Sequence, residues 1–189
     1  FCRVSQNVDQ LELIGTLQDL ATRDFLTGLP NRRCFLEHSQ RQLQGVQAQD
    51  DWIAVAMVDI DHFKHINDTF GHDGGDDALR ACADTVAAHA RECDLVARFG
   101  GEEFCLMVPG LAPAQAVAYF ETLRQSVEGL HVPIDGTALR MTVSIGLCCI
   151  RPRHDSLHEL ITEADRQLYL AKAGGRNRVC SAALTVAAS

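Results

Sequence analysis

The chain is organised around the stretch Arg98-Phe99-Gly100-Gly101-Glu102-Glu103-Phe104. The apolar run 95–97 precedes it and the apolar run 105–108 follows it. A glycine pair between two apolar runs is typical of a β-hairpin, because glycine adopts the positive φ angles that tight turns need. The adjacent acids Glu102 and Glu103 should point to opposite faces, so only one of them can fully serve a given site. Alone, the stretch is more typical of a solvated hairpin tip than of a binding site. The rest of the chain decides between these two interpretations.

The composition is that of a globular domain with an acidic surface. The chain has 189 residues and a formal net charge of −8, which argues against a nucleic-acid binder with a broad basic face. An anionic ligand would therefore need a divalent metal or a few placed cations. No apolar run reaches membrane-spanning length, so we expect no membrane contact from this fragment.

The eight cysteines show no C-x-x-C spacing, and most of them lie in apolar runs where cysteine behaves as a small hydrophobe. A reducing cytoplasm suits such a chain. The first residue is Phe1 rather than Met, and the start resembles no signal peptide. We therefore expect a piece of a longer protein.

Residues 4–21 carry apolar side chains at every third or fourth position, which predicts an amphipathic helix. The stripe fits packing on the domain and pairing with a partner helix equally well, because it is short and contains Gly15. We expect a linker helix over residues 1–22, one folded domain over 23–181 and a frayed tail over 182–189.

After this helix the sequence predicts the order helix, strand, two helices, hairpin, helix, strand, helix, strand. Asn31 should cap the first of these helices, and Ser156 with Glu159 forms a capping box for the last. The apolar run 53–58 is typical of a buried central strand, and Asp135 with Gly136 predicts a turn before a strand over 141–150. Antiparallel neighbouring strands with helices on one face make an α+β fold close to ferredoxin-like.

The central strand ends in Asp59-Ile60-Asp61, where two acids at i and i+2 share a face that suits a divalent cation. Asp59, Glu102 and Glu103 would converge if this strand neighbours the hairpin. Oxygen-bound Mg²⁺ ions at such a site serve phosphoryl transfer. Three cations could neutralise the phosphates of the substrate: Lys64, Lys172 and Arg176.

Asn67 and Asp76 suggest a reader of guanine, because a carboxylate accepts from the N1–H and N2–H₂ donors that adenine lacks. By spacing alone, a capping or turn role would be the default for both residues. His62 and His65 fit a solvated helix face better than a zinc site, which no cysteine pair completes. Tyr169 is expected to pack inside the domain.

Four motifs in order resemble the GGDEF family of diguanylate cyclases over residues 24–179. They are D-x-L-T-G-L-x-N-R-R at 24–33, D-I-D-H-F-K-x-I-N-D-T-F-G-H-x-x-G-D at 59–76, R-F-G-G-E-E-F at 98–104 and A-D-x-x-L-Y-x-A-K-x-x-G-R-N at 164–177. The resemblance implies a nucleotidyl-cyclase-like, antiparallel-rich sheet with surrounding helices and an N-terminal signalling helix.

The resemblance also implies a metal and catalytic site. Asp59, the backbone carbonyl of Ile60 and Glu102 would bind Mg²⁺, with Mn²⁺ as an alternative. Glu102 would act as base for the ribose 3′-hydroxyl with support from Glu103, and Lys64 would stabilise the transition state. Glu102 stands where the family name has Asp, and it keeps the carboxylate.

The same resemblance implies a GTP site. Asn67, His72 and Asp76 would line the guanosine pocket, and Asp76 favours GTP over mixed purine substrates. Lys172 and Arg176 would grip the triphosphate. Gly100 and Gly101 would let the backbone approach GTP closely.

The family reaction condenses two GTP into cyclic di-GMP and releases two pyrophosphates. Each domain binds one GTP, so the resemblance implies a homodimer whose domains face each other, an upstream sensory domain and a cytoplasmic location. It favours a dimerising role for the helix over 4–21. The rival hypotheses are a catalytically silent domain that senses GTP or cyclic di-GMP, and, more remotely, a nucleotidyl cyclase or polymerase palm with other substrates. The intact hairpin favours the enzyme.

Arg91 and Asp94, which lie shortly before Gly100, resemble the family's inhibitory R-x-x-D site, where product binds and holds the domains apart. Arg91 would stack on a guanine, and Asp94 would accept its N–H donors. A second arginine often completes such a site, and Arg124 is a candidate whose alignment stays open.

Overall fold

A computed structural model describes residues 22–45, 52–134, 136–151 and 156–183. The helix expected over 4–21 lies outside these residues, as does most of the tail expected over 182–189. No helix within the described ranges is both long and apolar enough to cross a membrane.

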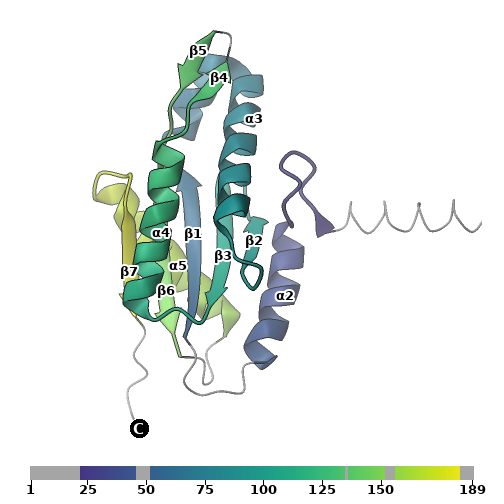
Figure 1. The fold of residues 1–189 in the computed structure, drawn as a ribbon, viewed down its shortest axis with the longest axis vertical. Helices are drawn as coiled ribbons and strands as arrows, with labels where there is room; N and C mark the ends of the chain where they lie inside the picture. The colour runs from purple at the N-terminus through teal and green to yellow at the C-terminus, as the bar shows by residue number, and fades with distance from the viewer. Residues whose placement is uncertain (1–21, 46–51, 135, 152–155, 184–189) are drawn as a thin grey trace, which may run out of the picture.

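The centre of the fold is a five-stranded sheet in the order β2-β3-β1-β6-β7 (Figure 1). Its strands are β1 (Ile53–Ile60), β2 (Leu95–Arg98), β3 (Glu103–Pro109), β6 (Val143–Ile150) and β7 (Val179–Ala183). All neighbouring pairs are antiparallel except β6 and β7, which run parallel. The α+β, antiparallel-rich fold expected from the sequence is confirmed.

The helices cover both faces of this sheet, so the expectation of helices on one face is wrong. The helices are α2 (Arg32–Gly45), α3 (Phe63–His89), α4 (Pro113–Glu128) and α5 (Leu157–Ala173). Every residue of β1 is buried, and its alternating side chains belong to two separate cores. One core joins the sheet to α3 and α4, and the other joins it to α2 and α5. A strand buried on both sides explains the unbroken apolar run at 53–58.

Local signals place most helix ends as expected. The Asn31 side chain accepts a hydrogen bond from the backbone N–H of Cys34 at the start of α2 (3.0 Å), and Ser156 with Glu159 forms the capping box of α5. The two helices expected over 63–90 form one element, α3, interrupted at Gly71, whose φ of 74° lies in the left-handed region.

A short second hairpin was missed by the sequence analysis. It consists of β4 (Val132–Ile134) and β5 (Thr137–Leu139) and forms a separate two-stranded sheet next to α3. The turn expected at Gly136 therefore closes this hairpin, and the long strand that follows begins at Val143.

The close packing of α5 on the sheet depends on Gly146 in β6. A Cβ atom at this position would lie 2.1 Å from both the Ala164 carbonyl oxygen and the Leu168 backbone nitrogen. Because backbone atoms cannot move aside as a flexible side chain can, only glycine allows this approach. The contact fixes the end of α5, from which Lys172 points to the end of β1.

Candidate active site

The end of β1 and the start of β3 bring the expected carboxylates together. Asp59 is the register partner of Glu103, and the backbone N–H of Ile60 donates to the Glu102 carbonyl oxygen (3.3 Å). The neighbouring strands therefore place Asp59, Glu102 and Glu103 at one edge of the sheet. The expected convergence required the strand that ends at Asp59 to neighbour the hairpin, and β1 does pair with β3.

The turn that joins β2 to β3 is fixed by hydrogen bonds rather than by positive φ angles. The backbone N–H groups of Phe99 and Gly100 donate to the Glu103 carbonyl oxygen (2.7 and 3.2 Å). Gly100 and Gly101 both have φ outside the left-handed region, so the reason given for them from sequence is wrong. A Cβ atom on Gly100 would lie 2.7 Å from Glu103 Oε2, whereas one on Gly101 would meet no atom within 4 Å. Gly100 thus accommodates the Glu103 carboxylate, and the surface at Gly101 is open.

Arg98 fastens this turn to the loop before α2. Its guanidinium donates to the Gly101 carbonyl oxygen through Nε and Nη2 (3.1 and 2.7 Å) and to the Asp24 carboxylate through Nη1 (3.0 Å). Asp24 also accepts from the N–H and hydroxyl of Thr27. This link between loop and hairpin was not foreseen, because 74 residues separate Arg98 from Asp24.

Asp59 is the most perturbed acid of the site. It is 4% exposed and forms an ion pair with Lys172, whose Nζ lies 2.7 Å from Asp59 Oδ2. Burial raises the pKa of Asp59 to about 6; the Lys172 ammonium opposes this effect, and the charges of Glu102 and Glu103 add to it. Burial and the neighbouring carboxylates both disfavour the ionised form of Asp59. A cation bound here would stabilise that ionised form.

The donors present fit Mg²⁺ bound with the help of a substrate. Within the described ranges, no three His, Cys, Asp or Glu side chains gather closely enough to hold a metal alone. Mg²⁺ usually takes only one or two carboxylates and completes its shell with water and substrate phosphates. Asp59 and Glu102, with the Ile60 carbonyl, would supply such a partial set of oxygen ligands.

Asn67 and Asp76 flank the interruption of α3 at Gly71. Both are partly exposed, and neither side chain makes a hydrogen bond or ion pair with a residue that the structure describes. A Cβ atom on Gly75 would lie 1.9 Å from Asn67 Oδ1, so the Asn67 amide rests against this glycine, next in sequence to Asp76. The default capping role for the two residues therefore has no support in the structure. His72, between them in sequence, is exposed.

The two remaining cations expected at the site come from different elements. Lys64 is exposed in the first turn of α3, directly after the end of β1. Arg176 lies in the turn between α5 and β7 and is partly exposed. Of the three cations, Lys172 alone contacts an acid of the site among the described residues.

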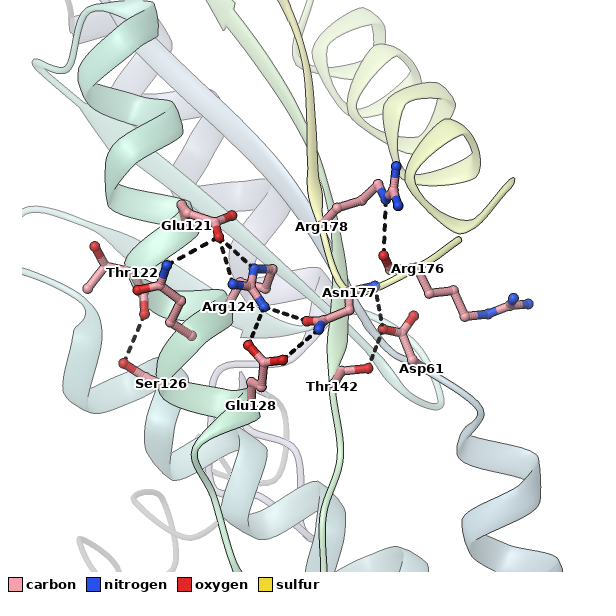
Figure 2. A network of polar contacts seen from close by, with 11 residues as sticks. Asp61, Glu121, Thr122, Arg124, Ser126, Glu128, Thr142, Arg176, Asn177 and Arg178 are labelled. Atoms are coloured by element: carbon pink, nitrogen blue, oxygen red, sulfur yellow. Dashed lines mark hydrogen bonds and ion pairs between the residues drawn. The ribbon is translucent and has the colours of Figure 1, made fainter. Parts of the chain in front are cut away.

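The i, i+2 spacing of Asp59 and Asp61 had suggested that both acids bind one cation. The structure gives Asp61 other partners. Its carboxylate accepts hydrogen bonds from Thr142 Oγ1 (2.7 Å) and the Asn177 backbone N–H (3.0 Å) (Figure 2). It also accepts one from Ser144 Oγ (2.6 Å). β1 ends at Ile60, so the strand alternation that would have aligned the two acids stops before Asp61.

At the R-x-x-D motif, Arg91 and Asp94 form a bidentate ion pair, in which Arg91 Nη2 lies 2.7 Å from Asp94 Oδ1. Tyr119 donates to Asp94 Oδ2 (2.8 Å), and the Asp94 side chain is 0% exposed. Burial favours a higher pKa for Asp94, but the hydrogen bonds from Arg91 and Tyr119 outweigh it and lower the pKa. Arg91 is 39% exposed and also donates to the Pro109 carbonyl oxygen, so its guanidinium is the accessible part of the motif.

Arg124 does not reach this motif. Its side chain is 10% exposed and contacts Glu121, Glu128 and Asn177 (Figure 2). Those contacts join α4 to the turn before β7, so the open alignment of Arg124 as a second inhibitory arginine finds no support.

Comparison with known proteins agrees with this geometry. Residues 21–178 match the family model "Diguanylate cyclase, GGDEF domain". The chain is 41% identical over 182 residues to "Diguanylate cyclase DgcM" of Escherichia coli. The matched residues cover 96% of this chain and 43% of that protein. It is 40% identical over 163 residues to "Response regulator PleD" of Caulobacter vibrioides, covering 85% of this chain and 36% of that protein.

Among solved structures, the coiled coil and GGDEF domain of DgcB from Caulobacter crescentus, in complex with c-di-GMP, matches with a TM-score of 0.87. The identity is 33%, and 96% of each chain is covered. The chain spans less than half the length of the two curated relatives. With a family model that covers most of its residues and relatives at about 40% identity, the chain belongs to the GGDEF domain family of diguanylate cyclases.

Proposed function

We propose that this chain is a diguanylate cyclase module that condenses two GTP into cyclic di-GMP and two pyrophosphates. The observation that carries the proposal is the junction of β1 and β3, where Asp59 lies opposite Glu103 and pairs with Lys172. This places acids suited to a divalent metal beside a cation suited to a phosphate. Family membership supplies the substrate class, and DgcM is named for this activity.

The base of GTP would bind at α3. The Asp76 carboxylate would accept from the N1–H and N2–H₂ groups of guanine, and Asn67 would use both ends of its amide. Neither side chain has a partner among the described residues, which supports this role because both polar groups are then available to a ligand. His72 would complete the pocket from its exposed position.

The triphosphate would lie between the ends of β1 and α5. Lys172 and Arg176 would bind its oxygens, and Lys64 would stabilise negative charge that develops during the reaction. The open surface at Gly101 leaves room for the nucleotide next to the hairpin. The Asp59–Lys172 contact supports this arrangement because it brings a phosphate-binding ammonium to the metal-binding carboxylate.

Asp59, Glu102 and the Ile60 carbonyl would hold Mg²⁺, or Mn²⁺ in its place. A bound divalent ion would neutralise phosphate charge and lower the pKa of a nearby hydroxyl. The chemical fit rests on hard oxygen donors and on the position of Asp59, whose pKa is raised chiefly by burial and further by the charges of Glu102 and Glu103.

In the chemical step, Glu102 would accept the proton of the ribose 3′-hydroxyl. The 3′-oxygen would form a bond to the α-phosphorus of the GTP held by a second copy, and the bond from that phosphorus to the bridging oxygen of pyrophosphate would break. Two such attacks close the ring. Each copy presents one Glu102 and one GTP, so the reaction needs a homodimer whose sites face each other.

The regulation that we propose has two parts. Product would bind the exposed Arg91 guanidinium, which Asp94 and Tyr119 hold in place. An upstream sensory domain would control dimerisation through residues 1–22, and the greater length of DgcM and PleD supports further domains in the whole protein. We place the domain in the cytoplasm, where its substrate GTP is made.

The test is to incubate the purified chain with GTP and Mg²⁺ and to resolve the products by chromatography. We expect cyclic di-GMP and pyrophosphate in a ratio of one to two. If GTP or cyclic di-GMP binds but no cyclic di-GMP forms, even with a dimerising coiled coil fused ahead of residue 1, the chain is a nucleotide sensor instead.

A further inference from the structure

The turn that carries Arg176 has an unusual backbone. Gly175, Arg176 and Asn177 have φ angles of 113°, 65° and 46°, so three successive residues lie in the left-handed region. Residues with a Cβ atom rarely adopt this conformation, and consecutive examples persist only where their surroundings hold them. Contacts around this turn must therefore fix its shape.

The first of these contacts comes from Asp61, immediately after β1. Asp61 Oδ2 accepts the Asn177 backbone N–H (3.0 Å) and the Thr142 hydroxyl (Figure 2). Asp61 Oδ1 accepts the Ser144 hydroxyl. Asp61 is two residues from Asp59. The turn that bears Arg176 is thus fastened to the strand end that bears Asp59.

The second contact is the Asn177 side chain, which uses both ends of its amide. Its Oδ1 accepts from Arg124 Nη1, and its Nδ2 donates to Glu128 Oε1 (2.8 Å). Arg124 is in turn paired with Glu121 and Glu128 (2.7 Å each). Because these charged partners belong to α4, the turn between α5 and β7 is held by a helix that carries none of the residues expected at the metal or GTP site.

Arg176 itself has no such support. Its guanidinium makes no hydrogen bond or ion pair with a residue in the described ranges, and Figure 2 shows its side chain extending away from the network. Its backbone N–H donates to the Ala171 carbonyl oxygen, and its carbonyl accepts from Arg178 Nε (3.1 Å). The conformation of the backbone at Arg176 therefore sets the direction in which its side chain leaves the turn.

We propose that Asn177 is a positioning residue, which Asp61 and Arg124 hold so that it aims Arg176 at the GTP triphosphate. The inference rests on the proposed function, in which Arg176 binds that triphosphate. Asn177 does not touch the substrate; it acts through the backbone of Arg176. A network that only attached α4 to the sheet would affect stability without affecting the contribution of Arg176 to binding.

A double-mutant cycle on GTP binding separates these two roles. The dissociation constant of a non-hydrolysable GTP analogue with Mg²⁺ is measured for the wild type, Asn177→Ala, Arg176→Ala and the double variant. We expect Arg176→Ala to weaken binding about thirtyfold and Asn177→Ala about tenfold, within the range for charge-assisted hydrogen bonds. The double variant should bind no more than about twice as weakly as Arg176→Ala, because Asn177 acts only through Arg176.

Arg124→Met provides a second test that keeps most of the side-chain volume, and it should weaken binding severalfold. The matched control is Arg166→Met, which removes a similar pair with Glu163 on the exposed side of α5 and should leave binding unchanged. Thermal unfolding identifies the folded fraction of each variant.

The positioning role is overturned if the two single effects multiply in the double variant, if Asn177→Ala binds the analogue as tightly as the wild type, or if the wild type binds none. A wild type that binds the analogue and shows the coupling, yet forms no cyclic di-GMP from GTP, would overturn the proposed function and leave the positioning role intact.

Discussion

Replacing Asp59 with Asn should stabilise the ligand-free protein near neutral pH while abolishing its activity. Asp59 is buried at the end of β1, and this burial, with the charges of Glu102 and Glu103, raises its pKa to about 6 against the pull of Lys172. The corresponding value for a free side chain is 3.8. Between these two values the folded chain holds a proton that the unfolded chain has released.

The sign of the effect follows from this difference. An acid whose pKa is raised by folding favours the folded state at low pH, and its contribution becomes unfavourable as pH rises from 3.8 through about 6. The full difference corresponds to about 3 kcal/mol of unfolding free energy, of which roughly 1 kcal/mol falls between about pH 5.0 and pH 7.5. Asparagine has no charge to bury, and Lys172, 34% exposed, can turn to water when its partner is lost.

The assay is urea unfolding of the wild type and Asp59→Asn at a series of pH values without Mg²⁺. The stability of the variant relative to the wild type should rise by roughly 1 kcal/mol from pH 5.0 to pH 7.5. Asp165→Asn on the exposed side of α5 controls for the loss of a surface carboxylate. Parallel pH curves for Asp59→Asn and the wild type would show that folding does not raise the pKa of Asp59. A variant that is less stable throughout would show that the buried carboxylate stabilises the fold.

Three further substitutions test separate parts of the site. Glu102→Ala should lower turnover at least about a hundredfold, the lower range for a lost general base, with little change in the thermal midpoint; retained turnover would rule out its role as base. Arg91→Ala should raise the cyclic di-GMP concentration that halves the initial rate by about tenfold or more, as for a lost charged hydrogen bond. Unchanged inhibition would dismiss this motif as the product site. Gly75→Ala should displace the Asn67 amide, which lies 1.9 Å from the added Cβ, and raise the KM for GTP about tenfold; an unaltered KM would show that Asn67 does not contact the base.

The features that sequence predicted well are those set by neighbouring residues. Ser156 caps α5 with Glu159 only three positions away, and the hairpin at 98–104 follows from a glycine pair between apolar runs. The meeting of Asp59 with Glu103 needed one further assumption, that β1 and β3 are neighbours. The family motifs made that assumption reasonable before the structure confirmed it.

Long-range polar partners could not be predicted in this way. Asp61 has its partners 81, 83 and 116 residues further along the chain, and no local pattern distinguishes it from a second metal ligand. Arg124 likewise contacts Asn177, 53 residues away, in addition to its neighbours Glu121 and Glu128 on α4. Such contacts arise only once the strands and helices have been placed.

Tyr169 shows a different limit. It was expected to pack inside the domain but is 70% exposed. The buried stripe of α5 includes Leu168, and successive residues on a helix lie about 100° apart, so Tyr169 falls outside the stripe. Helical periodicity predicted this exposure better than residue type did.

Mixing active and inactive chains tests whether two copies of the hairpin at 98–104 act together. Wild-type chains are incubated with GTP, Mg²⁺ and a tenfold excess of Glu102→Ala chains. Most active chains then pair with a partner that binds GTP but activates no hydroxyl. We expect cyclic di-GMP per wild-type chain to fall severalfold while a linear dinucleotide with one phosphodiester bond accumulates. Formation of cyclic di-GMP at an unchanged rate per wild-type chain would show that the reaction does not need a Glu102 from each of two copies.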